Sequence, residues 1–263
     1  MDLGLRGRVA LVAAASKGLG RAVAHELAAE GARVVICARG GDALKAARDD
    51  IARLTRGDVR AVVADVSTTE GIEAVTNDAL RTYGHVDILV NNAGGPPSGP
   101  FEQHSWEEWE KAVNLTLRSA VELTRRLLPG MRERKWGRVI NITSIAVKQP
   151  VDGLILSNSI RAAVTGWART LATEVAPVGV TVNNVLPGYT RTDRVDQLNA
   201  ARAASEGVML EEIQRRIEAQ IPLRRLGEPR EFGAMVAFLA SERASYVTAQ
   251  SIAVDGGWIR SLL

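Results

Sequence analysis

Short apolar runs alternate with longer amphipathic segments along the whole chain, and this alternation constrains the fold more than any other feature. The first six of the seven runs are nearly continuous in hydrophobicity and rich in β-branched residues, which is typical of strands buried on both faces. We expect strands at Val9–Ala14, Arg33–Ala38, Val59–Val63, Val86–Val90, Val139–Thr143, Val180–Val185 and Ser251–Val254. Apolar residues three and four positions apart predict helices between them, at Leu19–Glu30, Gly41–Leu54, Thr68–Thr82, Trp106–Lys135 and Ala162–Ala176.

This alternation predicts an α/β fold, a doubly wound seven-stranded parallel sheet with helices on both faces. A closed (β/α)8 barrel is the competing architecture, but it needs an eighth strand that residues 188–228 do not offer. No Pro/Gly/Ser-rich linker divides the 263 residues, so we expect a single domain over residues 1–263. Residues 191–220 are polar and helix-prone and follow a strand's carboxyl end. We interpret them as a substrate lid, with a plain helical insertion as the alternative.

Charge and composition exclude several classes of protein. The net charge is only +3, and the 33 Lys+Arg residues interleave with the 30 Asp+Glu residues. The chain therefore has no basic run of the kind that binds nucleic acid. Cys37 is the only cysteine and the three histidines lie far apart, so we expect neither a disulfide nor a metal site. No apolar stretch reaches the ~18 residues of a membrane span, and the N-terminus lacks a signal-peptide core. We therefore expect a cytoplasmic protein with no membrane partner.

A glycine-bearing turn joins the first predicted strand to the first predicted helix. Residues 13–20 read A-A-A-S-K-G-L-G. The bare N–H groups and partial positive charge of a helix N-terminus suit a diphosphate, and Gly18 and Gly20 permit its close approach. Such a turn can also be purely structural, but the strand–turn–helix context favours a nucleotide. The expected contacts are Ala14, Ser16, Lys17, Gly18, Leu19 and Gly20.

Further motifs give almost the whole chain a resemblance to the short-chain dehydrogenase/reductase family, in the branch of the 3-oxoacyl-(acyl carrier protein) reductases. These motifs are Asp65-Val66, N-N-A-G at 91–94, Asn114-Leu115, Ile142-Thr143-Ser144, Pro187-Gly188, Gly227-Glu228-Pro229 and V-D-G-G-W at 254–258. The resemblance implies a Rossmann fold, a small-molecule carbonyl or alcohol substrate, and a homotetramer or homodimer. The cofactor contacts that it implies are Asp65, Val66, Asn92, Ala93, Gly94, Pro187, Gly188 and Thr190.

The glycine loop departs from the family motif T-G-x-x-x-G-x-G. Ala13 and Ala14 stand where that motif has its threonine and its first glycine. The Cβ of Ala14 is harmless if φ is negative and costly if φ is positive. It also narrows the approach to the diphosphate, so we expect an effect on the affinity or pose of the cofactor.

The end of the second strand favours NADP(H) over NAD(H). An acidic residue there would bind the ribose 2′-hydroxyl of NAD, but the strand ends in Cys37-Ala38-Arg39-Gly40. The planar guanidinium of Arg39 can make paired, charge-assisted bonds to a 2′-phosphate. Lys17 is a second candidate for the same phosphate, although both could be solvated surface charges.

The family's catalytic tetrad of Asn, Ser, Tyr and Lys is only half present. Asn114 and Ser144 match, but Ser157 stands at the tyrosine position and Arg161 at the lysine position. A phenol near pKa 10 that a neighbouring ammonium lowers can donate a proton near neutral pH, whereas a serine hydroxyl alone is far too weak an acid. Arg161 keeps a positive charge, and with a pKa above 12 it should not give up its proton.

Three hypotheses follow from this site. The first is an NADP(H)-dependent carbonyl or alcohol oxidoreductase with an altered proton donor, in which Asn114, Ser144, Ser157 and Arg161 converge. Tyr189 and Lys148 are candidate replacement acids, though for each the absence of a catalytic role is the favoured interpretation. The second hypothesis is a catalytically weak or inactive dinucleotide-binding protein. The third is another reaction on the same fold, such as an elimination or a hydrolysis.

Overall fold

Seven parallel strands form one open sheet in the computed structural model, which describes residues 2–262. The strands are β1 (Val9–Val12), β2 (Arg33–Ala38), β3 (Val59–Val63), β4 (Ile88–Asn91), β5 (Gly137–Ile142), β6 (Val180–Pro187) and β7 (Ser251–Val254). Their order is β3-β2-β1-β4-β5-β6-β7. The α/β prediction is therefore confirmed, and the unpaired edges at β3 and β7 exclude a closed barrel.

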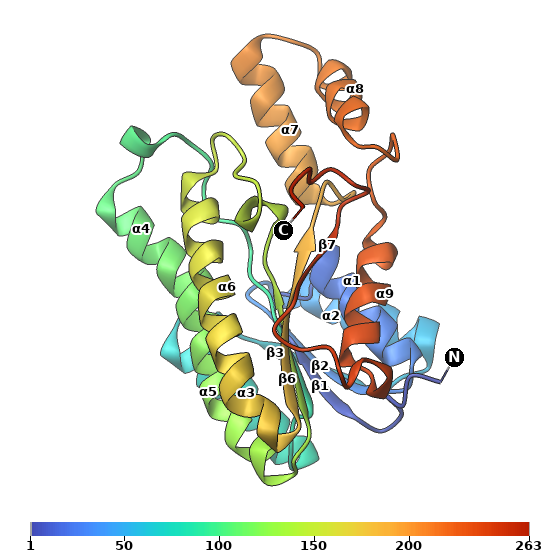
Figure 1. Ribbon diagram of the computed structural model, residues 1–263. Coiled ribbons are helices and arrows are strands. Elements are labelled where there is room, and N and C mark those ends of the chain that lie inside the picture. The colour runs from blue at the N-terminus through green and yellow to red at the C-terminus, as the bar shows by residue number, and fades with distance from the viewer. Residues whose placement is uncertain (1, 263) are drawn as a thin grey trace.

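Helices cover both faces of this sheet (Figure 1). On one face lie α1 (Gly18–Ala29), α2 (Gly41–Thr55) and α9 (Pro229–Ala240), and on the other lie α3 (Thr69–Tyr83), α5 (Ser119–Glu133) and α6 (Ile155–Val175). Each face buries its own aliphatic cluster, with Phe232 of α9 the largest fully buried side chain. Strands that are apolar on both faces require these two layers, because each face must be removed from water.

The order of the strands positions a crevice at one edge of the sheet. The chain moves outward from β1 to β3 and then returns to pair β4 with the other side of β1. The loops after β1 and β4 therefore diverge at the carboxyl ends of two adjacent strands. In open parallel sheets, ligands bind at this topological switch point.

Several element boundaries differ from the sequence-based expectation: β4 begins at Ile88, β5 spans Gly137–Ile142 and β6 extends to Pro187. The first strand ends at Val12, because Ala13 and Ala14 already belong to the loop. The helix expected over Trp106–Lys135 is interrupted: α4 (Trp106–Ala112) passes through a π-helical turn, Val113–Arg118, into α5. The helix α6 begins seven residues earlier than expected. Its first turns carry small polar residues, which contribute nothing to an apolar periodicity.

The polar segment 191–220 forms two helices, α7 (Asp193–Glu206) and α8 (Leu210–Gln220). They stand beyond the carboxyl ends of the strands (Figure 1). Ile213 and Ile217 of α8 and Ala203 of α7 form a small apolar cluster of their own, against which Trp258 packs. Across the described residues, no helix is long and apolar enough to cross a membrane.

Candidate active site

One large cavity lies at the carboxyl ends of the strands, with a volume of about 620 Å³. Of the cofactor contacts and tetrad positions that the sequence analysis assigned, all but Asn114 line this cavity. They are Ala14, Ser16, Lys17, Gly18, Leu19, Gly20, Arg39, Asp65, Val66, Asn92, Ala93, Gly94, Ser144, Ser157, Arg161, Pro187, Gly188 and Thr190. Segments far apart in the sequence therefore form one continuous wall.

The glycine loop forms a close-fitting cradle between β1 and α1. A Cβ atom built on Gly20 would lie 2.5 Å from the main-chain oxygen of Ala14 and 2.8 Å from Nδ2 of Asn92, so only glycine fits there. Asn92 Nδ2 donates to the main-chain oxygens of Ala13 and Ala14 at 3.1 and 3.2 Å, which ties the end of β4 to the loop. The first turn of α1 carries no acidic residue, so its N–H groups and dipole remain suited to an anion.

Ala14 lies in the left-handed region of backbone conformation, with φ at +49°. An L-residue pays roughly 1–2 kcal/mol for this conformation because its Cβ crowds the neighbouring carbonyl. The alanine that replaces the family's glycine is therefore strained. Of the two possibilities that the sequence left open, the structure has a positive φ at Ala14, for which a Cβ is costly.

We expect Ala14→Gly to raise the free energy of unfolding by up to about 1 kcal/mol, because relief of the strain exceeds the added entropy of the unfolded chain. In a thermal melt, this corresponds to a rise of roughly 2–4 °C for a domain of this size. Ala15→Gly is the matched control, since Ala15 is buried and its φ is not positive. The Ala15→Gly variant should have a lower melting temperature than the wild type. An equal fall in melting temperature in both variants would contradict the inference that Ala14 is strained.

Arg39 and Asp65 lie at one end of the cavity, at the carboxyl edge of β2 and β3. Asp65 Oδ1 accepts hydrogen bonds from N and Oγ of Ser67, at 2.9 and 2.7 Å. Burial opposes ionisation of Asp65, but the bonds from Ser67 and the charge of Arg39 outweigh it and lower the pKa of the carboxyl group. The exposed Arg39 side chain faces the cavity without an ion pair among the described residues. It is thus free to bind a phosphate.

Lys17 is engaged differently from the expectation of a contact to a 2′-phosphate. Its Nζ lies 3.1 Å from Oδ2 of Asp193, the first residue of α7, so an exposed ion pair joins the glycine loop to the segment 191–220. Such exposed pairs contribute only about 0–1 kcal/mol. The pair can therefore open without a large cost in stability.

Ser157 and Arg161 lie one helical turn apart on α6, at the other end of the cavity. Arg161 Nε donates to Ser157 Oγ over 3.2 Å. Arg161 Nη1 donates to the main-chain oxygens of Ile142 and Thr143, both at 2.9 Å, and so ties α6 to the end of β5. Ser144, which follows β5, lines the same part of the cavity, and its Oγ accepts from the N–H of Ala146.

The Arg161 guanidinium is a buried cation. Burial, with a further contribution from the charge of Arg194, lowers the pKa of Arg161 to about 10. The buried guanidinium therefore holds its proton less tightly than a solvated arginine does. Arg161 nevertheless remains protonated near neutral pH, so its role is to supply positive charge and hydrogen bonds.

The cavity lining does not include Asn114, Tyr189 or Lys148. Asn114 lies half-buried in the π-helical turn, where its main-chain oxygen accepts from the N–H of Ser119. Its neighbour Leu115 lines the cavity, and the convergence of Asn114 with the other tetrad positions stays a prediction. Tyr189 packs edge-on against Trp258, with ring centroids 5.9 Å apart, and Lys148 is exposed. Neither forms part of the cavity lining.

A ladder of buried amides crosses the sheet at the site, and the sequence analysis missed it. Asn91 Nδ2 donates to Asn141 Oδ1, Asn141 Nδ2 to Asn184 Oδ1, and Asn184 Nδ2 to Ser251 Oγ, over 2.9, 3.0 and 3.1 Å. These residues are register partners on β4, β5, β6 and β7. Each asparagine sits in an apolar run, and only the pairing of the strands reveals that the three are aligned.

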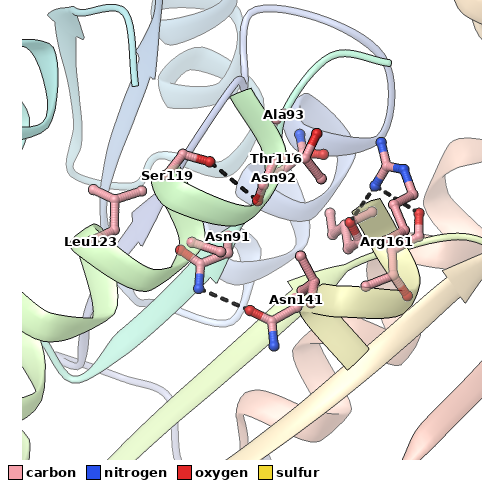
Figure 2. A pocket seen from close by; sticks show the side chains of 12 residues that line it. Asn91, Asn92, Ala93, Thr116, Ser119, Leu123, Asn141 and Arg161 are labelled. Atoms are coloured by element: carbon pink, nitrogen blue, oxygen red, sulfur yellow. Dashed lines mark hydrogen bonds between the residues drawn. The ribbon is translucent and has the colours of Figure 1, made fainter. Parts of the chain in front are cut away.

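A second, small cavity of about 10 Å³ lies between this ladder and Arg161 (Figure 2). Three buried atoms of its lining residues lack a hydrogen-bond partner among the described residues: Asn91 Oδ1, Thr116 Oγ1 and Thr143 Oγ1. A cavity of roughly 10–15 Å³ with two to four polar partners is suited to a single water molecule. The volume of the small cavity and its three unpaired polar atoms therefore suit one bound water.

The site as a whole fits a dinucleotide. Its volume is in the range of about 300–1,000 Å³ typical of ligand sites. The Gly20 cradle and the free N-terminus of α1 suit a diphosphate at its centre, and Arg39 suits a further phosphate at one end. Hydroxyl and guanidinium groups occupy the opposite end, at Ser144, Ser157 and Arg161.

Comparison with known proteins agrees with this geometry. Residues 13–259 match the family model described as enoyl-(acyl carrier protein) reductase. The chain is 34% identical over 257 residues to the 3-oxoacyl-(acyl-carrier-protein) reductase FabG of Aquifex aeolicus, covering 98% of this chain and 99% of that protein. It is 36% identical over 255 residues to FabG of Vibrio cholerae, covering 97% and 98%.

Two solved structures are also close in shape. L-sorbose reductase from Gluconobacter frateurii, complexed with NADPH and L-sorbose, has a TM-score of 0.94 and 34% identity, with 100% of both chains covered. A variant of actinorhodin polyketide ketoreductase with NADPH has a TM-score of 0.93 and 35% identity, covering 97% of this chain and 98% of that one.

Fold and site together define an oxidoreductase built on a dinucleotide-binding α/β sheet. More particularly, the chain belongs to the short-chain dehydrogenase/reductase family, in the branch of the 3-oxoacyl-(acyl carrier protein) reductases.

Proposed function

We propose that this protein is an NADP(H)-dependent oxidoreductase of carbonyl and alcohol substrates, resembling the 3-oxoacyl reductases, with an altered proton donor. One observation carries the proposal. A single cavity joins the glycine cradle and Arg39 at one end to Ser144, Ser157 and Arg161 at the other. Bound along this cavity, the cofactor supplies the hydride chemistry. The residues around it bind and orient the cofactor and the substrate, and they transfer the proton.

Ser157 is the proposed proton donor to the carbonyl oxygen. Its Oγ accepts from the Arg161 guanidinium, which leaves the hydroxyl hydrogen free to be donated toward the cavity. A hydrogen bond from a cation favours the negative charge that develops on a donating oxygen. Ser144 Oγ is engaged by the N–H of Ala146, and so presents its own O–H in the same way. The pair thus offers two hydroxyl donors in place of one phenol.

The preference for NADP(H) is supported by Arg39 and by the absence of a carboxylate at the end of β2. Solved relatives that hold NADPH, such as the sorbose reductase and the actinorhodin ketoreductase, agree with this preference.

In the same proposal, α7 and α8 act as a lid over the substrate end. The Lys17–Asp193 pair joins α7 to the glycine loop. Assembly into a homodimer or homotetramer stays a prediction.

A second candidate, a dinucleotide-binding protein without turnover, is favoured by one observation: Ser157 and Arg161 replace the tyrosine and lysine of the family's tetrad. Titration of NADPH by its fluorescence, followed by absorbance decay with a panel of ketones and oxo acids, separates the two. We expect saturable binding and turnover. Binding with no turnover of any carbonyl compound would select the second candidate, and absence of binding would overturn both.

A further inference from the structure

Two arginine side chains line the cavity near Ser157, the part that we call its substrate end, and they come from two different helices. Arg161 is held by α6, as described above, and Arg194 belongs to the first turn of α7. Both line the cavity, and the charge of Arg194 adds to the effect of burial in lowering the pKa of Arg161. Sequence analysis had assigned no role to Arg194.

Arg194 is fixed in place by the loop after β4. Its Nη2 donates to the main-chain oxygen of Pro96 over 2.8 Å. Its guanidinium lies against Gly95, where a Cβ atom would be 3.0 Å from Nε and 3.1 Å from Nη2. The side chain is half-buried, and this burial lowers the pKa of Arg194. The Gly-Gly-Pro segment thus makes room for a guanidinium that is aimed at the cavity.

Neither arginine has a carboxylate partner among the described residues. Two acidic residues are found among those that line the cavity, Asp65 and Asp193. Asp193 is paired with Lys17 over 3.1 Å, and Asp65 lies beside Arg39 and accepts from Ser67. The guanidinium groups of Arg161 and Arg194 are therefore left without a carboxylate partner, while both carboxylates of the lining have partners of their own.

Such an arrangement is costly unless a ligand completes it. Buried charges are normally paired, since a lone ion loses its hydration without compensation. Two like charges that face one cavity repel each other as well. A planar carboxylate is the natural complement, because a guanidinium binds it through paired N–H bonds.

We propose that the substrate carries a carboxylate that binds between Arg161 and Arg194. Because Arg161 also contacts Ser157, the carboxylate lies only a few bonds from the carbonyl group that Ser157 protonates. The substrate class is then a short oxo acid or the matching hydroxy acid. This inference rests on the proposed function for its reaction, but the anion site itself is independent of turnover.

Malonate and malonamide provide a matched pair of probes, since they are similar in size and differ in charge. Each is titrated by calorimetry into the protein saturated with NADP⁺. We expect malonate to bind and malonamide to bind at least about tenfold more weakly, because only the carboxylates of malonate form charge-assisted bonds with the guanidinium groups. Arg194→Gln should weaken malonate by about tenfold or more for the same reason. Arg194→Lys should retain part of the affinity.

Arg202→Gln is the matched control, because Arg202 lies on the same helix but pairs with Glu206 instead of facing the cavity. It should leave malonate binding nearly unchanged. Equal binding of the two probes, binding of neither, or an Arg194→Gln variant that keeps full malonate affinity would overturn the proposal. So would a loss of NADP⁺ affinity as large as the loss of malonate affinity, since Arg194 would then serve the cofactor.

The two proposals can fail separately. If malonate binds in an Arg194-dependent manner but no carbonyl compound is reduced, the reductase proposal fails and the anion site stands. If neutral ketones are reduced but malonate does not bind, the anion site fails and the reductase stands.

Discussion

The double variant Ser157→Tyr, Arg161→Lys is expected to reduce neutral ketones about 10²-fold faster than the wild type, the lower end of what general acid catalysis supplies. Ser157 lines the cavity wall in the first turns of α6, where a phenol can extend into the open volume. A lysine one turn later would place an ammonium beside that phenol and lower its pKa toward neutrality. Either single substitution should gain less, because the acid and its neighbouring cation act as a unit.

The variant Ser157→Phe, Arg161→Lys is the matched control, since it keeps the ring and the ammonium but has no hydroxyl. Its rate should not rise. The gain in the tyrosine variant should also fall as the pH rises through the pKa of the new phenol, because only the protonated phenol donates. Melting temperatures are measured alongside, because Arg161→Lys removes part of the tie between α6 and the oxygens of Ile142 and Thr143.

The opposite result is also informative about the wild type. If the wild type reduces its substrate briskly and the double variant is slower, then the Ser157–Arg161 pair is itself competent. In that case Ser157→Ala should abolish most of the wild-type rate while leaving NADPH affinity intact. A slower double variant together with a fully active Ser157→Ala variant would remove Ser157 from the chemistry.

The sheet could be predicted from the sequence for one physical reason, whereas most of the cofactor-facing residues were implied by the resemblance to the reductase family. A strand buried on both faces must be apolar throughout, so its ends mark where the chain turns at the edge of the sheet. Motif residues such as Asp65 and Asn92 directly follow those strands, and parallel order brings their ends together. Hydrophobic continuity therefore located the carboxyl edge of the sheet, and the family motifs indicated which residues at that edge line the cavity.

Other parts of the site depend on tertiary contacts and leave no local signal. Arg194 lies in a polar run in which nothing distinguishes it from Arg191 or Arg202, yet it alone of the three lines the cavity. The early start of α6 escaped prediction because Ser157 and its polar neighbours face a cavity, which removes the apolar periodicity of a packed helix. The sign of φ at Ala14 is likewise set by the loop around it.

Charge reversal at the end of β2 should have the second large effect. We expect Arg39→Asp to weaken NADPH binding by about 100-fold, because it removes a charge-assisted bond of roughly 1.5–3 kcal/mol and adds repulsion of the 2′-phosphate. NADH affinity should hold or improve, since an aspartate there can accept from the ribose 2′-hydroxyl. Fluorescence titration of both cofactors at low and at physiological salt measures the change in preference.

Arg33→Asp provides the control for long-range charge, because Arg33 begins the same strand at its opposite end and is exposed. It makes the same change in net charge far from the cavity wall, and salt screens its effect over about 8–10 Å. The ratio of NADPH to NADH affinity should therefore change in Arg39→Asp and stay as it is in Arg33→Asp. A wild type that binds NADH as tightly as NADPH at low salt would refute the assignment of Arg39 before any variant is made. An equal loss of NADPH affinity in both variants would assign the preference to net charge. A bond between the Arg39 guanidinium and the 2′-phosphate can be lost only when Arg39 itself is changed.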